Sequence, residues 1–528
     1  MWIGVLIICF IYVYIIVGGE LCLKLIGLIG SGSSTAYAPV IIWDRVEHYA
    51  KEEQLVVVDD SRRSMRFLGV LRLIRRYEPF LDSRKRTSYV DNPDLVETGT
   101  LPHSSGYVSI IGVISENGVV EPQLPPNPGS KVYVVESPTD LSLELGGGLV
   151  IGVHKYSGIE IPLDPRGIPY HIGVVGATGT GKSRLVKAFI DEVLAKTNYN
   201  IIVFDHTGMD YSVFYKDNVV EGSRTVLDIS LITDMILYRT GLNRNTYEPY
   251  IMVSLLSYIY NYIREKHPEL LQELIGSSSG GRQKTLVPKT PSFQEFLNKI
   301  DYSRLQEILA EKNIVWDITS FKEQLIRTLQ NMRARDSSKI RLGIALDVYL
   351  GKQFFESLNK RDMLPRDIVG YAGNNRLVVV DLSTEDLEAR RYIVSSVINE
   401  LWRIIEEKRE PINTLVVIDE AHNYACRSCG VSHRAITRIA REGRKWGLGV
   451  LLATQRIIDI DPEIRGNINT WLFSKLQTPG DFNELKGYMD LSGISENTLA
   501  ILGKREFFVA GLMNPLRIPI LIKVRTVE

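Results

Sequence analysis

The eight residues Gly176-Ala-Thr-Gly-Thr-Gly-Lys-Ser183 combine glycines with a lysine and a hydroxyl group, a set suited to holding phosphates. In a phosphate-binding loop of this pattern, backbone amides and the start of the following helix bind the phosphate charge. Lys182 is placed to reach the β- and γ-phosphates of a nucleotide, and Ser183 to ligate Mg²⁺. An apolar run precedes the loop and a helical pattern, 183–196, follows it, which favours this interpretation over a chance glycine-rich turn.

Two acids end a second apolar run, Thr414-Leu-Val-Val-Ile-Asp-Glu420. Asp419 is placed to hold the magnesium shell. Glu420 is placed to polarise an attacking water molecule as a general base. An ordinary strand that happens to end in acids is the alternative, and the phosphate loop makes it less attractive.

A third apolar run, 449–453, leads into polar residues that include Gln455. Ligands of open α/β sheets bind at the carboxyl ends of strands, so Gln455 is placed to contact the γ-phosphate or the attacking water molecule. Just upstream, Arg441 and Arg444 are candidate arginine fingers, which stabilise transition-state charge and often come from a neighbouring subunit. Surface basic residues at a helix end are the alternative for these two.

The sequence also contains a second set of nucleotide-like motifs. Asp205-His-Thr-Gly208 matches the D-x-x-G of GTPases, and Asn359-Lys-Arg-Asp362 matches their guanine-reading N-K-x-D. However, Asn359 follows a helical run, 348–358, where a guanine-reading motif would follow an apolar strand. This alternative also leaves Asp419 and Glu420 without a role, so ATP with Mg²⁺ is the expected ligand and ATP hydrolysis the expected reaction.

Composition limits the possible partners and compartments. The 528 residues are 45% hydrophobic and 23% charged, and 62 basic residues balance 62 acidic ones. A zero net charge excludes nucleic-acid binding by bulk electrostatics and leaves only local binding. Four cysteines are too few for a disulfide framework. The spacing His422-x₃-Cys426-x₂-Cys429-x₃-His433 leaves open structural zinc, a Cys426–Cys429 disulfide or free thiols.

The first nineteen residues carry no charged side chain and are almost wholly apolar. As a helix they would span about 28 Å, close to the hydrocarbon thickness of a membrane. A cleaved signal peptide would need a basic start and a small-residue cleavage site, and a buried helix is the other alternative. We therefore expect a single-pass membrane protein whose ATPase part is cytoplasmic, with residues 1–30 as the membrane helix and juxtamembrane segment.

The remainder is expected to be an α/β protein in four further parts. Short β-branched runs between turn residues, 54–58, 106–113, 131–135 and 149–153, predict a small β-barrel over 35–165. Apolar strands that alternate with helices then predict a parallel sheet over 166–227 and 366–528. The expected strands of this sheet are 171–175, 200–204, 376–380, 414–418, 449–453 and 471–476. Residues 228–365 read as a helical insertion, with a flexible connector over 276–291.

These motifs together resemble the HerA family of DNA-translocating ATPases, within the HerA/FtsK group, from about residue 54 to 528. The resemblance rests on the barrel, the phosphate loop and the motifs Val203-Phe-Asp-His-Thr-Gly208, Val379-Val-Asp-Leu-Ser383, Ile418-Asp-Glu-Ala-His-Asn423, Glu442-Gly-Arg-Lys445 and Ala453-Thr-Gln-Arg456. It implies a RecA-like core, a hexameric ring with DNA in a central pore, and nucleotide sites at subunit interfaces. It also implies that Asp205 joins the nucleotide site, that Glu420 is the catalytic acid and that Arg444 is the finger acting in trans.

The expected site is therefore as follows. The nucleotide-binding residues are Gly176, Ala177, Thr178, Gly179, Thr180, Gly181, Lys182, Ser183, Arg184, Asp205 and Asp419. The magnesium ligands are Ser183 and Asp419. The catalytic residues are Glu420, Lys182, Arg444, Arg441 and Gln455.

Three features depart from the family pattern. Members often carry an acid directly after D-x-x-G, where this chain has Met209 and then Asp210, and commonly an arginine where it has Tyr170. Repair-type members lack a leading membrane helix, which favours the membrane branch of type IV secretion ATPases and CedB-type archaeal DNA-import ATPases. The main hypothesis is a membrane-anchored hexamer that moves DNA through a channel protein. The alternatives are a DNA-end-processing translocase that works with a nuclease, and an ATP-gated assembly scaffold.

Overall fold

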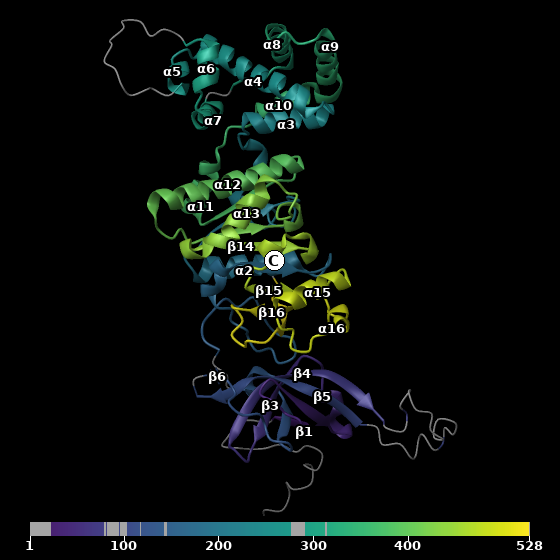
Figure 1. Ribbon diagram of the computed structural model, residues 1–528. Helices are drawn as coiled ribbons and strands as arrows, with labels where there is room; N and C mark the ends of the chain where they lie inside the picture. Colours follow the sequence, from purple (N-terminus) through teal and green to yellow (C-terminus); the bar gives the residue numbers. More distant parts are fainter. Residues whose placement is uncertain are drawn as a thin grey trace, which may run out of the picture. The chain divides into compact units, whose positions relative to one another are not determined.

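The computed structural model describes residues 23–78, 81, 94, 103–116, 118–141, 145–275, 291–311 and 314–526 (Figure 1). The predicted membrane helix over residues 1–19 and nearly all of the predicted connector over 276–291 lie outside these ranges. Within them, no helix has both the length and the apolar character needed to cross a bilayer. The described residues form two compact units, the first from 1–199, 420–422 and 440–528 and the second from 200–419 and 423–439.

The first unit begins with a β-barrel, which confirms the prediction of a barrel ahead of the phosphate loop. Strand order is β2-β1-β7-β3-β4-β5-β6, and β2 also pairs with β5, which closes six strands. Buried side chains such as Val56, Phe67 and Leu71 fill its interior. The strands are β1 Lys24–Ile29, β2 Tyr37–Ile42, β3 Gln54–Asp60, β4 Met65–Tyr77, β5 His103–Ser115, β6 Gly118–Val120 and β7 Lys131–Val134.

Two sequence predictions about this region are wrong. Residues 24–29 were expected to be juxtamembrane, but they form β1, which pairs with both β2 and β7. The run 149–153 was expected to be a barrel strand, but β8 (Gly152–His154) pairs with β17 (Ile520–Val524) in a different sheet. Both errors concern short strands with a partner far away in the sequence, β7 for β1 and β17 for β8, and tertiary pairing of that kind leaves no local pattern.

The second sheet of the first unit positions the phosphate loop. Its strands run in the order β14-β9-β15-β16-β17-β8, with β9 parallel to β14 and β15 and antiparallel pairing beyond β15. The central strand β9 is completely buried, as expected for a strand covered on both faces. The further elements are β9 Ile172–Val175, β14 Leu448–Thr454, β15 Thr470–Phe473, β16 Glu506–Gly511, α2 Lys182–Lys196, α14 Pro462–Arg465, α15 Pro479–Tyr488 and α16 Glu496–Ala500.

The second unit has four parallel strands in the order β11-β12-β10-β13. Their carboxyl ends therefore meet at one edge, where Asp205 ends β10 and Asp419 follows β13. The strands are β10 Asn200–Asp205, β11 Val219–Glu221, β12 Leu377–Asp381 and β13 Thr414–Ile418, and the accompanying helices are α11 Pro365–Asn375, α12 Leu387–Lys408 and α13 Val431–Glu442.

Between β11 and β12 the chain forms an all-helical segment with its own apolar core. Asp228 caps the first of these helices by accepting a hydrogen bond from the Leu231 N–H, at 2.8 Å. Phe296, Phe321 and Phe355 are fully buried in this core. The helices are α3 Ile229–Thr240, α4 Arg244–Lys266, α5 Leu270–Leu274, α6 Phe293–Lys299, α7 Tyr302–Glu311, α8 Ile318–Asn331, α9 Asp336–Ala345 and α10 Gly351–Leu358.

Two buried histidines are expected to make the stability of the first unit depend on pH. Burial lowers the pKa of both His154 and His171 to about 4, from an ordinary value of 6.5. Between these two values the unfolded chain binds more protons than the folded chain, so stability falls as pH falls from 6.5 towards 4. Each histidine contributes up to about 1.4 kcal/mol per pH unit in that window.

We therefore expect the melting temperature to fall between pH 7 and pH 5. Differential scanning fluorimetry of wild type and His154→Asn checks this, because the variant lacks one of the two titrating groups. A variant whose melting temperature falls as steeply as that of the wild type would contradict the assignment.

Candidate active site

The phosphate loop has the conformation that its sequence requires. It joins β9 to α2, and Gly179 and Gly181 adopt φ angles of 81° and 101°. Residues other than glycine rarely adopt these angles. The Lys182 ammonium donates to the Gly176 carbonyl at 2.8 Å, so it already lies inside the loop. The loop is therefore already folded before a nucleotide binds. Phosphate oxygens would take the place of the Gly176 carbonyl as acceptors for Lys182.

Arg505 also contributes to the loop, and no sequence motif had pointed to it. Its backbone N–H donates to the Thr180 carbonyl at 2.8 Å. A Cβ atom at Gly181 would lie 3.2 Å from Arg505 Cγ, which gives Gly181 a second reason to be glycine. The Arg505 guanidinium donates to Thr526 Oγ1 at 2.6 Å.

Three predicted site residues of the first unit form a hydrogen-bonded series. Thr178 Oγ1 donates to Gln455 Oε1 at 2.9 Å, and Gln455 Nε2 donates to Glu420 Oε1 at 2.8 Å. This orientation uses both ends of the amide, with the acceptor towards the hydroxyl and the donor towards the carboxylate. Gln455 therefore connects the phosphate loop to Glu420.

The second carboxylate oxygen of Glu420 is buried and has no hydrogen-bond partner. The His422 Nδ1 atom lies 3.3 Å from it, an ion-pair distance that counts only if the imidazole is protonated. Glu420 also has a φ of 44°, a backbone conformation that costs a residue of this kind on the order of 1 kcal/mol. A strained residue that presents an unsatisfied carboxylate oxygen suits a group that accepts a proton from water.

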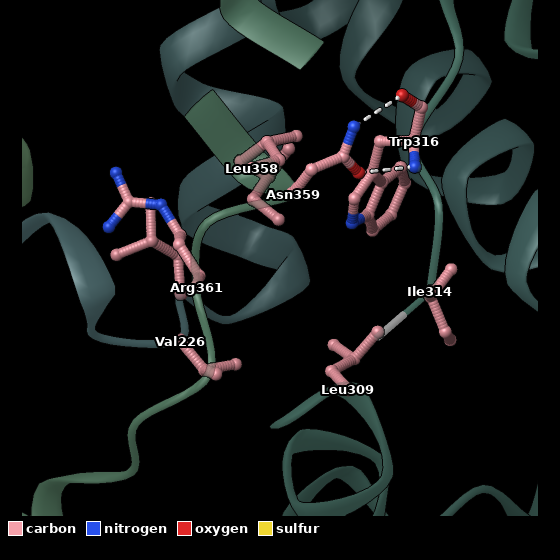
Figure 2. Close-up of a pocket in the computed structure, with 9 residues that line it drawn as sticks. Val226, Leu309, Ile314, Trp316, Leu358, Asn359 and Arg361 are labelled. Atoms are coloured by element: carbon pink, nitrogen blue, oxygen red, sulfur yellow. Dashed lines mark hydrogen bonds between the residues drawn. The ribbon is translucent and has the colours of Figure 1, made fainter. Parts of the chain in front are cut away.

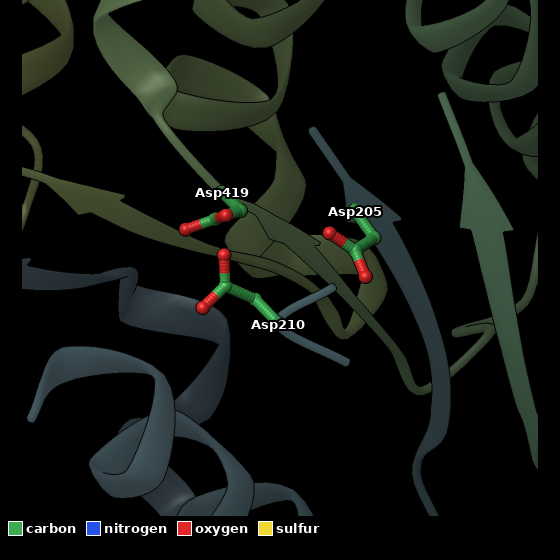
Figure 3. Close-up of side chains that lie close together, drawn as sticks. All are labelled: Asp205, Asp210 and Asp419. Atoms are coloured by element: carbon green, nitrogen blue, oxygen red, sulfur yellow. The ribbon is translucent and has the colours of Figure 1, made fainter. Parts of the chain in front are cut away.

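In the second unit, Asp205, Asp210 and Asp419 bring carboxylate oxygens within 4.8 Å of one another (Figure 3). Asp205 is fully buried, and its oxygens accept hydrogen bonds from the loop that follows it. The N–H donors are those of Thr207, Gly208, Tyr211 and Ser212, at 3.2, 2.9, 2.9 and 2.9 Å. We infer that the main role of Asp205 is to fold this loop.

The folded loop brings Asp210 back beside Asp419, a placement that the sequence did not predict. Asp210 is half-buried and accepts a hydrogen bond from Thr207 Oγ1 at 2.8 Å. Gly208 is required for this turn, because its φ is 72° and a Cβ atom there would lie 2.6 Å from Asp381 Oδ1.

Carboxylate oxygens are the ligands that Mg²⁺ prefers, so the donor set of this cluster fits that ion. The amides of the following loop bind both oxygens of Asp205. Asp210 and Asp419 bring further carboxylate oxygens to the cluster, and we infer that these two would hold the ion. When bound, the ion would neutralise charge on the phosphates.

Asp210→Asn is therefore expected to raise the Mg²⁺ concentration for half-maximal ATP hydrolysis about tenfold, because one charged ligand is lost. Magnesium titrations of ATPase activity measure this shift. Asp217→Asn is the matched control, because Asp217 is an exposed acid of the same unit outside the cluster. An equal shift in both variants, or none in either, would contradict a metal-holding role for Asp210.

The two candidate arginine fingers differ in how they are held. Arg441 forms an exposed ion pair with Glu463, at 3.1 Å, and such pairs contribute little to stability. The Arg444 guanidinium lies 4.1 Å from the centroid of the Tyr170 ring, a cation–π contact. Tyr170, which stands where the family commonly has an arginine, therefore supports Arg444. A role in trans for either arginine stays a prediction.

The guanine-reading alternative is excluded by the contacts of Asn359. Its side chain accepts from the Trp316 N–H at 2.6 Å and donates to the Trp316 carbonyl at 3.0 Å (Figure 2). The cavity beside it, lined by Val226 and Leu309 among others, has a volume of about 20 Å³. That is room for about one water molecule and not for a base. Asp362, the other end of the motif, pairs with Arg224 at 2.8 Å.

The structure also decides among the three alternatives left open for Cys426 and Cys429. They form a disulfide, so they are not zinc ligands in this state. Among the described residues, the group that could hold a metal ion is the aspartate cluster of the second unit.

Residues 149–401 match a protein family described as "Helicase HerA, central domain". The matched range contains the phosphate loop, the D-x-x-G loop and the helical segment. The chain is an ATPase whose central part is similar to the central domain of HerA helicases. The HerA resemblance inferred from the motifs is thereby confirmed.

Curated relatives extend the similarity to HerA helicases beyond that domain. The "DNA double-strand break repair helicase HerA" of Sulfolobus acidocaldarius is 24% identical over 422 residues, which cover 77% of this chain and 75% of the relative. The protein of the same name from Pyrococcus furiosus is 23% identical over 515 residues, covering 89% and 86%. Among solved structures, VirB4 of Thermoanaerobacter pseudethanolicus is 15% identical with a TM-score of 0.42, covering 72% of this chain and 97% of that one. The two curated relatives carry the HerA name, and neither supports the finer resemblance to CedB-type import ATPases.

Proposed function

We propose that this chain is a DNA translocase of the HerA type that couples ATP hydrolysis to movement along DNA. The relatives named as DNA double-strand break repair helicases support this proposal, because their similarity spans most of the chain. The observation that carries the chemistry is the unsatisfied, buried oxygen of Glu420, joined through Gln455 to the phosphate loop.

In the proposed reaction, the loop amides and Lys182 bind the phosphates of ATP. Glu420 accepts a proton from the attacking water through its free oxygen, while Gln455 holds the other oxygen in place. Ser183 and Asp419 are proposed as magnesium ligands from the sequence pattern, and the aspartate cluster adds Asp210 as a further candidate. Arg184, the next residue, is proposed to contact the nucleotide.

DNA is the proposed track, and a homohexamer the proposed active form. The test is ATPase activity of the full chain with and without duplex DNA, together with displacement of a triplex-forming strand as a measure of movement. DNA should stimulate hydrolysis, and Lys182→Ala should abolish both activities. Lys187→Ala is the matched control, because Lys187 lies on the same helix but pairs with Asp191. Hydrolysis with neither DNA stimulation nor strand displacement would overturn the proposal and favour the ATP-gated scaffold.

The two finer hypotheses differ in the partner. The relatives are named as DNA double-strand break repair helicases. A role in repair favours the hypothesis of DNA-end processing together with a nuclease. The uncharged run of residues 1–19 favours a membrane-anchored import motor that works with a channel protein. Fractionation of cells that express the full chain or a chain lacking residues 1–19 separates them. A full chain found in the soluble fraction with a nuclease would remove the import hypothesis, and membrane retention that depends on residues 1–19 would support it.

A further inference from the structure

The Cys426–Cys429 disulfide lies in the segment that joins β13 to α13. This segment begins with Asp419 and Glu420, the residues proposed to hold Mg²⁺ and to activate the attacking water. The disulfide closes a tight turn, in which the Cys429 N–H donates to the Cys426 carbonyl at 2.9 Å. Where ATP is plentiful, cellular thiols are usually kept reduced, and a disulfide there is usually transient.

The two sulfurs are in different surroundings. Cys429 is only 1% exposed, whereas Cys426 is partly exposed. The Arg391 guanidinium, on α12, lies 3.5 Å from Cys429 Sγ. Cys429 also precedes the first turn of α13, where the helix dipole favours negative charge. An incoming thiolate therefore has access to Cys426, and Cys429 is the sulfur whose departure as a thiolate is stabilised.

We propose that Cys426 and Cys429 form a reversible redox site that exchanges with cellular dithiols and disulfides and controls the ATPase. In reduction, an external thiolate attacks Cys426 Sγ, the Cys426–Cys429 bond breaks, and Cys429 leaves as a thiolate beside Arg391. A second external thiol then attacks the mixed disulfide and releases Cys426. The protein disulfide gains two electrons and two protons, and the external dithiol becomes a disulfide. Oxidation is the reverse exchange, with an external disulfide as the electron acceptor.

Direct contacts link this site to the loops around it. Arg391 Nε donates to the Asn423 carbonyl at 2.9 Å, so one arginine contacts both the disulfide and the segment ahead of it. Ser432 Oγ donates to the carbonyls of Tyr424 and Cys429, at 2.8 and 3.1 Å. The Tyr424 hydroxyl lies 2.8 Å from His206 Nδ1, and His206 follows Asp205. Opening the disulfide therefore frees a turn whose contacts extend to the D-x-x-G loop.

The first test equilibrates the full chain in glutathione buffers of graded redox potential. Alkylation and mass spectrometry count the thiols, and ATPase activity is measured in the same samples. We expect one two-electron transition at Cys426 and Cys429 and a change of at least threefold in ATPase rate that follows it. Cys426→Ser should hold the ATPase rate at the value of the reduced protein, whatever the redox potential. The Cys9→Ser/Cys22→Ser control should keep the transition. A pair that is reduced only when the chain unfolds, or that is reduced without any change in rate, would overturn the proposal.

The second test asks whether Arg391 assists the exchange. Reduction of the oxidised full chain by dithiothreitol should slow about tenfold in Arg391→Gln, because the leaving thiolate loses its cation. Arg391→Lys, which keeps the charge, should stay within about threefold of the wild type. Since both variants lose the guanidinium contact to Asn423, a purely structural role would affect them equally, and that result would remove Arg391 from the mechanism.

Discussion

Replacing Glu420 with glutamine is expected to slow ATP hydrolysis about 10²- to 10⁴-fold, the range found when a positioned general base is lost. The amide has nearly the same shape as the carboxylate and can still contact Gln455, so the loop and its strained backbone should persist. Nucleotide binding, measured with a fluorescent ATP analogue, should therefore change less than threefold. Phosphate release at saturating ATP measures the loss.

The control for this change is Glu160→Gln, an exposed glutamate of the same unit. It should hydrolyse ATP at the wild-type rate. If Glu420→Gln retains hydrolysis within a factor of three, then Glu420 is not the base, and its free oxygen requires another explanation. If nucleotide binding falls along with hydrolysis, its role is in binding.

The fold around the candidate site could be predicted because its signals are local. The phosphate loop, its strand and its helix are adjacent in the sequence, and Asp419 and Glu420 directly follow an apolar strand. A parallel strand that is buried on both faces reads as a continuous apolar run, as residues 201–204 of β10, 377–380 of β12 and 415–418 of β13 do. The hydrogen bonds from Thr178 through Gln455 to Glu420 join segments that are distant in the sequence. Each of these three residues nevertheless lies at a predicted strand end or in the phosphate loop.

Asp210 and Arg505 could not be predicted, because their placement depends on backbone hydrogen bonds. The HerA pattern often has an acid directly after D-x-x-G, and this chain has the exposed residue Met209 at that position. The sequence therefore suggested that the acid was missing. The loop curls because Asp205 accepts the N–H groups of Tyr211 and Ser212, and this curl presents Asp210 instead. Short antiparallel strands such as β16 and β17 were missed for a similar reason, since their partners are set by tertiary pairing.

Arg444→Ala is the second change with a large expected effect, a loss of about 10³-fold in ATP turnover if the guanidinium acts as an arginine finger. The cation–π contact with Tyr170 orients this side chain within its own subunit. Tyr170→Phe keeps the aromatic face and should retain most of the activity. Arg441→Ala, which loses only an exposed ion pair, separates the two candidates, because the finger is the one whose loss removes turnover and spares ATP binding.

Mixing two inactive variants tests whether Arg444 acts on a neighbouring subunit. Lys182→Ala subunits lack a working phosphate loop but keep Arg444, and Arg444→Ala subunits have the opposite defect. If the finger acts in trans, some interfaces in an equal mixture combine an intact phosphate loop from one subunit with an intact Arg444 from its neighbour. Random assembly makes about a quarter of the interfaces complete, so activity should return to about a quarter of the wild-type rate. If Arg444 serves the site of its own subunit, no interface in the mixture is complete and activity stays absent. Recovery would therefore establish both the finger and the oligomer, because a monomeric enzyme cannot complement itself.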